Sequence, residues 1–131
     1  MTELDWRINP GRKIATLELR EDSTVADMQN AIRRLPDVPG WQNDFDIIIE
    51  IRPDATLEDF TADNLVQHKD FMRVWNAENR KGHSPRTALV CSDDLKRTIP
   101  SLWEAMTRAG WMTAIGVFET REAAYRWIAD K

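Results

Sequence analysis

The sequence predicts a single α/β domain built on a mainly parallel five-stranded sheet with about four helices. Short apolar segments rich in β-branched residues alternate with longer segments whose apolar residues recur every three or four positions. That alternation is typical of strands connected by helices in a largely parallel sheet. The chain has 131 residues, enough for one domain with its own core and too few for two. Residues 1–131 are therefore expected to fold as one unit.

A β-hairpin is predicted at the start of the chain. Apolar and polar side chains alternate over residues 4–8 and again over residues 14–19, which indicates two strands. Between them, Pro10 fixes its own φ and Gly11 can adopt a positive φ, so this segment is predicted to form the turn. The first strand is then the antiparallel member of the sheet.

The other elements follow from capping residues, periodic apolar stripes and buried apolar runs. They are a helix from Val25 to Leu35 capped by Ser23 or Thr24, a strand at 45–51, a long helix capped by Thr61 that ends before Gly82, a strand at 87–91, a helix that begins near Thr98, a strand at 112–118 and a last helix capped by Thr120. Strands buried on both faces favour a parallel sheet with right-handed crossovers. The sequence leaves the order of the strands open.

Charge and composition exclude several classes of function. The 18 Lys and Arg against 22 Asp and Glu give a net charge of −4, whereas nucleic-acid binders usually carry a basic excess. Residues 1–5 lack the features of a secretory signal, and the strongly apolar run at 47–49 is far too short to span a bilayer. The single cysteine, Cys91, agrees with a reducing compartment. We expect a cytoplasmic protein that binds no nucleic acid and does not insert into a membrane.

Neither a metal site nor a cofactor site is predicted. His68 and His83 are the only histidines, and neither has a second metal-ligating residue three or four positions later. His68 is expected to be half-buried on a helix and His83 to lie in a solvated loop. The carboxylates of Glu58, Asp59 and Asp63 are expected to form the solvated start of the second helix. The five glycines are isolated, so no glycine-rich phosphate loop is present.

One motif has the spacing of a known catalytic site. Cys91 and Arg97 are separated by five residues between a predicted strand and a predicted helix, as in cysteine-dependent phosphatases. Such chemistry needs a thiolate and an arginine that holds the phosphate. The loop between them has no glycine, and Asp93 and Asp94 would repel a phosphate and raise the pKa of the thiol. A phosphatase is therefore a remote alternative, and we expect no catalytic activity.

Six tryptophans and five methionines supply the candidate contact residues. Trp75 and Trp103 lie on predicted apolar helix stripes, so core packing is the first interpretation. The second interpretation is an apolar pocket or partner surface, lined by these rings and by Met72 and Met106. Trp41, in a Pro-Gly-Trp-Gln loop, is the residue least explained by packing and the best single candidate for a contact with a ligand or partner.

The order of elements is similar to that of SpoIIAA-like proteins, a branch of the STAS-type domains related to anti-sigma-factor antagonists. By sequence the resemblance is closest at Arg86–Val90, Leu102–Met106 and Val117–Ile128. These are packing motifs, so the resemblance implies the fold and a non-catalytic regulatory module that acts through an unidentified protein partner. STAS-like folds also resemble lipid-binding domains of the Sec14 type, which implies an alternative: a binder or sensor of a small apolar, lipid-like ligand.

The resemblance also implies a site of modification. In the true antagonists, a partner kinase phosphorylates a serine at the start of the helix after the third strand, where free amides and the helix dipole favour a phosphate. The matching segment here is Phe60–Leu65, and the serine position is occupied by Ala62. Thr61 is thus the candidate phospho-acceptor, although capping of the helix is the simpler interpretation of this residue. An exposed edge strand would also favour a homodimer.

Overall fold

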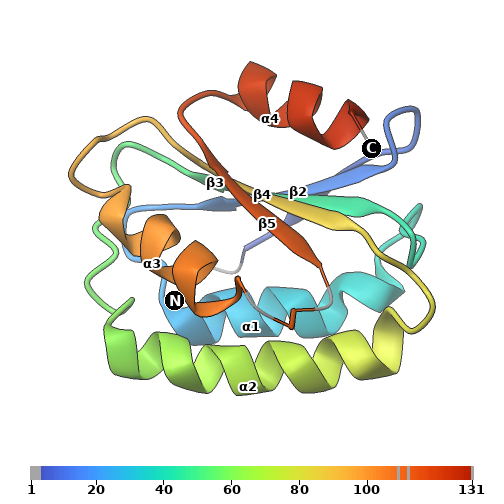
Figure 1. Cartoon of the computed structure of the whole chain (residues 1–131), viewed down its shortest axis with the longest axis horizontal. Helices are drawn as coiled ribbons and strands as arrows, with labels where there is room; N and C mark the ends of the chain where they lie inside the picture. Colours follow the sequence, from blue (N-terminus) through green and yellow to red (C-terminus); the bar gives the residue numbers. More distant parts are fainter. Residues whose placement is uncertain (1–3, 109, 112, 131) are drawn as a thin grey trace.

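A five-stranded mixed sheet forms the centre of the structure, a computed structural model that describes residues 4–108, 110–111 and 113–130 (Figure 1). The strands lie side by side in the order in which they occur in the chain. The elements are β1 (Trp6–Asn9), β2 (Ile14–Leu19), α1 (Val25–Arg34) with a short 3₁₀ turn η1 (Leu35–Asp37), β3 (Asp46–Ile51), α2 (Ala62–Asn79), β4 (Arg86–Cys91), α3 (Thr98–Met106), β5 (Ala114–Phe118) and α4 (Arg121–Ala129).

The direction of the strands agrees with the sequence pattern. β1 runs antiparallel to β2, and β2, β3, β4 and β5 are parallel to one another. The register is continuous, since Leu17 of β2 lies opposite Trp6 of β1 and Ile49 of β3. The predicted α/β class and the antiparallel first strand are confirmed, and the strand order that the sequence left open is the sequential one.

This sequential order decides where the helices lie. Right-handed crossovers that each advance one strand in the same direction put their helices on the same face of the sheet. Figure 1 shows α1, α2 and α3 together on one face and α4 alone on the other. The first face of the sheet is therefore covered by three helices and the second face by one.

Each strand contributes side chains to two cores, because successive residues point to opposite faces. On β3, Ile47, Ile49 and Ile51 belong to the large core beneath α1, α2 and α3, whereas Ile48 belongs to the core under α4. The second core is small, and its buried members are Ile14, Ile48, Ala88, Val90, Ala124 and Ile128.

The hairpin turn differs from the prediction in one detail. The residue with a positive φ is Lys13, at 57°, and not Gly11. The backbone N–H of Arg12 donates to Asn9 Oδ1 at 3.1 Å, and that of Lys13 donates to the Pro10 carbonyl oxygen at 3.3 Å. These bonds close the first turn and shift the left-handed residue to the end of the loop, as in longer hairpin connections.

The predicted helix starts are close to those observed. Thr24 Oγ1 accepts from the N–H of Asp27, and Asp27 Oδ2 accepts from the N–H of Thr24, both at 3.0 Å, so Thr24 is the cap of α1. α3 begins at Thr98, as Pro100 in its first turn suggests. β5 begins at Ala114, and Met112, the predicted start of that strand, lies outside the described residues.

Candidate functional site: a cavity between the sheet and three helices

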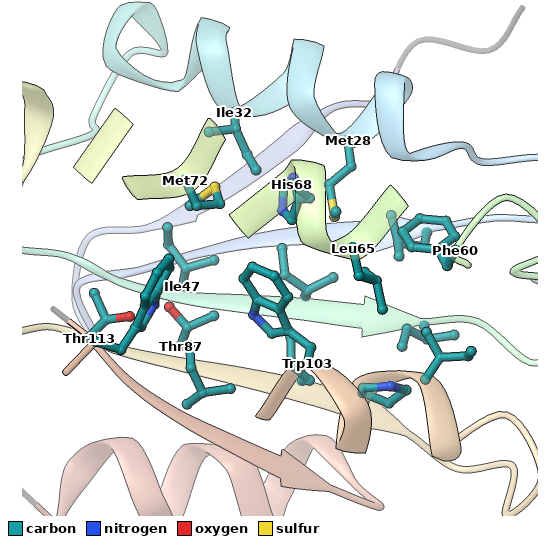
Figure 2. A pocket seen from close by; sticks show the side chains of 18 of the residues that line it. Met28, Ile32, Ile47, Phe60, Leu65, His68, Met72, Thr87, Trp103 and Thr113 are labelled. Atoms are coloured by element: carbon teal, nitrogen blue, oxygen red, sulfur yellow. The ribbon is translucent and has the colours of Figure 1, made fainter. Parts of the chain in front are cut away.

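A cavity of about 90 Å³ lies between the sheet and helices α1, α2 and α3. Figure 2 shows this space from close by, with side chains from the sheet and the helices converging on it. Its floor follows the register of the sheet: Ile47, Thr87 and Ile115 lie opposite one another on adjacent strands, and Ile49 and Leu89 form the next row on the same face. Apolar side chains therefore make most of the floor.

One stripe of α2 forms the opposite wall. It consists of Leu65, His68, Met72, Asn76 and Arg80, which are spaced three or four residues apart and so lie on one side of the helix and its C-cap. Along this stripe the side chains change from apolar at the start of α2 to amide and guanidinium at its end. The cavity therefore has an apolar end and a polar end.

Further walls come from α1, from α3 and from the segment before α2. Met28 and Ile32 of α1 and Trp103 of α3 line the cavity, together with Leu57 and Phe60. Leu57 has a φ of 58°, a left-handed conformation that is costly for a residue other than glycine. Its side chain is buried, so packing around the cavity holds this backbone in place.

His68 is the titratable group in the middle of the stripe. It is only 5% exposed, so the expected half-buried position is wrong. Its Nδ1 lies 3.1 Å from the amide nitrogen of Gln29, and its ring stacks on Phe71 and contacts Trp103. Burial lowers the pKa of His68 to about 4, because the aromatic and apolar surroundings disfavour the charged ring. At neutral pH this part of the cavity wall is therefore uncharged.

Arg80 is the charged group at the polar end. It is 3% exposed, and its Nη2 donates to the carbonyl oxygen of Phe45 at 2.7 Å. Its guanidinium lies 5.0 Å from the ring centroid of Trp41 and 5.9 Å from that of Trp75, within the range of cation–π contacts. Burial lowers the pKa of Arg80 to about 10, against the opposing charges of Asp46 and Asp44, so it carries a positive charge at neutral pH.

The five candidate contact residues have different positions. Trp103 and Met72 line the cavity. Trp75 is a buried member of the large core and Met106 packs against that core, and neither lines the cavity. Trp41 packs edge-on against Phe45 and over Arg80, and its Nε1 donates to Asn43 Oδ1 at 3.1 Å. The loop tryptophan thus packs on the residue that forms the polar end of the cavity.

Sequence reasoning missed the polar residues of the site: Asn76, Arg80, Thr87 and Thr113. A signal for the first two was present, because Asn76 and Arg80 continue the apolar stripe of Leu65, His68 and Met72 at intervals of four. Polar residues on a buried stripe mark positions where a helix contacts something other than packed hydrocarbon. No comparable signal distinguishes Thr113, which is brought to the cavity only by the pairing of β5 with β4.

The Cys91 motif has a geometry that does not favour phosphatase chemistry. Cys91 is 1% exposed, and its pKa is raised, first by burial. Arg97 donates from Nε to the carbonyl oxygen of Cys91 at 3.0 Å and from Nη2 to that of Ser92 at 3.2 Å, and it pairs with Asp94 at 3.0 Å. The guanidinium is thus bound to backbone carbonyls and a carboxylate, while the thiol is held in its neutral form.

Thr61 lies at the start of α2, as its interpretation as a helix cap predicts. Its Oγ1 accepts from the N–H of Asn64 at 3.2 Å, so its role as the N-cap of α2 is confirmed, whereas its role as a phospho-acceptor stays a prediction. Asp59, by contrast, is more than a solvated carboxylate at the start of α2, which is the role that the sequence predicts. Its Oδ2 accepts from the N–H of Val25 at 2.8 Å, and so it stabilises the start of α1 from a distant part of the chain.

Within the described residues, no helix has both the length and the apolar character needed to cross a membrane. The same part of the chain contains no cluster of three or more histidine, cysteine, aspartate or glutamate side chains able to hold a metal ion. Comparison of the chain with protein-family models, with curated proteins and with solved structures found no match.

Proposed function

We propose that this protein is a non-catalytic binding module that holds a small apolar molecule in the cavity between the sheet and helices α1, α2 and α3. The observation that supports the proposal is the cavity of about 90 Å³ in the middle of the large core. Protein cores are normally packed without voids larger than a water molecule. Apolar atoms bound in such a space would gain packing contacts that its lining residues otherwise lack.

The volume limits the size of the ligand. An engineered apolar cavity of about 150 Å³ binds benzene, and one water molecule takes about 30 Å³ in the liquid. The cavity described here is therefore suited to an apolar group of a few carbon atoms. Met28 and Met72, on α1 and α2, both line it. Because methionine side chains are flexible, they can make room for a longer chain at little cost.

Neutral apolar probes test this proposal directly. Trp103, Trp111 and Trp6 line the cavity, so binding of 1-butanol or 1-hexanol should change the intrinsic tryptophan fluorescence. The same probes should raise the melting temperature, since a ligand that binds only the folded state stabilises it. If neither probe changes the fluorescence or the melting temperature up to its solubility limit, the proposal is wrong.

A matched pair of variants locates the binding. Leu89→Phe adds volume on the cavity face of β4 and should weaken binding of both probes at least tenfold. Val90→Ile adds volume to the next residue, whose side chain belongs to the core under α4, and should leave binding unchanged. Equal effects of the two variants would mean that the probes bind elsewhere.

Binding to a protein partner is a second candidate function, and one surface feature favours it. Val66 and Val74 of α2 are 54% and 57% exposed, and they lie eight residues apart on one side of the helix. Exposed apolar side chains on one helix face suit a partner contact. The double variant Val66→Asp with Val74→Asp should abolish capture of a protein partner while hexanol binding persists. If the double variant still captured the partner, this face of α2 would not be the binding surface, and the second candidate function would lose its support.

The resemblance to SpoIIAA-like, STAS-type proteins supports a regulatory role in the cytoplasm for such a module. In this role, occupancy of the cavity would change the affinity for a partner, with Thr61 as an exposed residue at the start of the neighbouring α2. β1 and β5 are the edge strands of the sheet, which supports homodimerisation as part of the proposal. Sedimentation velocity at several concentrations tests it, and a concentration-independent monomer would contradict it.

A further inference from the structure

Arg80 has hydrogen-bond donors that the protein does not use. Its Nε and Nη1 are buried and have no hydrogen-bond partner among the described residues, while Nη2 is bound to Phe45. These two nitrogens carry three N–H groups. Leaving a buried donor unpaired is costly, especially on a charged group, so native proteins rarely do so without a reason. Arg80 is also one of the residues that line the cavity.

Arg80 is not an isolated polar residue in that wall. Asn76, one turn earlier on α2, is 2% exposed and lines the same cavity. Thr87 lies in the first cavity-facing row of the sheet, and Thr113 precedes β5 at the same end. Figure 2 shows Thr87 and Thr113 on the side of Met72 and Ile47, away from Phe60 and Leu65. The polar groups are thus gathered at one end of an otherwise apolar cavity.

We propose that the cavity binds a short-chain carboxylic acid as its anion, with the carboxylate accepting hydrogen bonds from Arg80 and the alkyl chain directed toward Phe60 and Leu65. A carboxylate is planar, accepts several hydrogen bonds and matches the guanidinium geometry. This inference rests on the proposed function, because it assigns a chemical class to the ligand of the same cavity.

The neighbouring carboxylates do not accept hydrogen bonds from Nε or Nη1 of Arg80. The charges of Asp46 and Asp44 raise the pKa of Arg80, but burial outweighs them. Asp46 accepts at Oδ1 from the backbone N–H of Arg86, and Asp44 forms an ion pair with Lys13 at 3.4 Å. A carboxylate in the cavity would therefore meet a guanidinium that still has free donors on Nε and Nη1.

A pair of ligands with the same chain length tests the inference on the unaltered protein. Hexanoate and 1-hexanol differ in the head group, and their affinities can be compared at neutral pH by tryptophan fluorescence or calorimetry. Hexanoate should bind at least tenfold more tightly than 1-hexanol, and hexylamine should not bind measurably. Equal affinities, or a preference for the alcohol, would overturn the inference.

The variant Arg80→Met assigns the preference to one residue. It should remove the preference for hexanoate over 1-hexanol and leave hexanol binding within about threefold. Arg73→Met is the matched control, because Arg73 is an exposed arginine on the same helix, paired only with Asp70 at 3.3 Å among the described residues. This control should keep the full preference. A preference that survives in folded Arg80→Met would overturn the inference.

A spectroscopic measurement on the unaltered protein covers the case in which Arg80→Met fails to fold. With hexanoate labelled with ¹³C at the carboxyl carbon, the NMR shift of the bound ligand reports its protonation. A carboxylate bound to Arg80 should stay ionised at pH values below the ordinary pKa of the acid. A bound acid that takes up its proton at or above that pKa would overturn the inference.

The two proposals fail in distinguishable ways. If 1-butanol and 1-hexanol bind but hexanoate has no advantage, the inference on Arg80 is wrong and the apolar binding function stands. If none of the three compounds binds, the proposed function itself fails, and the inference fails with it. A higher affinity for hexanoate that Leu89→Phe does not reduce would place an anion site outside the cavity and would also overturn the inference.

Discussion

The imidazole of His68 and the indole of Trp103 pack against each other with ring centroids 5.1 Å apart and planes inclined by 44°. The two rings come from α2 and α3 and meet at the cavity wall. Gln29 is the hydrogen-bonding side chain near the imidazole, at 3.1 Å from Nδ1. A proton on this ring would add a charge to an environment that offers little solvation, which is why burial lowers its pKa.

The first prediction concerns the pH dependence of stability. The pKa of His68 is about 4 in the folded protein, against 6.5 for an ordinary histidine. Between these values the unfolded chain binds a proton that the folded chain does not, so stability falls as the pH falls. The stabilisation is complete above pH 6.5, is lost as the pH decreases to about 4, and amounts to about 3 kcal/mol.

Chemical denaturation at a series of pH values measures this effect. His68→Phe keeps an aromatic ring and removes the titrating group, so its free energy of unfolding should depend less on pH in that interval. His83→Gln, in an exposed loop, leaves His68 in place and should keep the steeper dependence of the unaltered protein. Identical curves for His68→Phe and the unaltered protein would contradict the prediction.

The second prediction concerns the capping of α1 by Asp59. Its carboxylate accepts from the N–H of Val25 at 2.8 Å, and its backbone oxygen accepts from Asn64 Nδ2 at 2.7 Å. Asp59→Ala removes the first bond, together with a longer one from Asn64 Nδ2 to Asp59 Oδ1 at 3.4 Å, and should lower the free energy of unfolding by about 1 kcal/mol. Asp59→Asn keeps an acceptor and should cost less. Glu58→Ala changes the exposed neighbour and should have little effect, so a cost equal to that of Asp59→Ala would refute the capping role.

The third prediction concerns the reactivity of Cys91. Since the thiol is buried and its pKa is raised, a thiol reagent should modify it at least a hundredfold more slowly in the folded protein than in denaturant. Hydrolysis of an aryl phosphate should be the same for the unaltered protein, for Cys91→Ser and for a blank without protein. A rate that depends on Cys91 would restore the phosphatase hypothesis.

Much of the fold could be predicted because local signals and tertiary structure agree. The β-branched run that ends at Ile51 forms the strand buried on both faces, and Thr24, Thr61 and Thr120 cap the helices that follow them. The strand order could not be predicted, since neither hydrophobic periodicity nor capping specifies which strands are neighbours. The turn residue was also missed, because Asn9 closes the hairpin through its side chain.

Less of the candidate site could be predicted, because a cavity is a property of packing. Trp103 and Met72 were identified by their size and type, and both line the cavity. The role of Arg80 depends on Phe45 and Trp41, which lie 35 or more residues earlier in the chain. A sequence pattern does not bring these segments together, and so an arginine after an apolar helix is first interpreted as a solvated C-terminal charge.

The last prediction concerns the ion pair that joins α4 to the sheet. Arg121 donates from Nε and Nη2 to the two carboxylate oxygens of Glu50, each at 2.8 Å. The hydrogen bonds from Arg121 are the largest cause of the lowered pKa of Glu50. Because Glu50 is ionised more readily in the folded state, the pair stabilises the fold above pH 4.5, and this stabilisation is lost as the pH falls further.

A double-mutant cycle with Glu50→Gln and Arg121→Met isolates this interaction from the other effects of each substitution. Since Arg121 is 42% exposed, we expect a coupling free energy of only about 1 kcal/mol at neutral pH. The Asp70–Arg73 pair, with both side chains more than half exposed and 3.3 Å apart, is the matched control and should give about 0.3 kcal/mol. At a pH where Glu50 is protonated, the first coupling should fall toward that of the control. A coupling close to zero at neutral pH would mean that α4 is held by apolar packing against Ile48 and Val90, with no contribution from the charged pair.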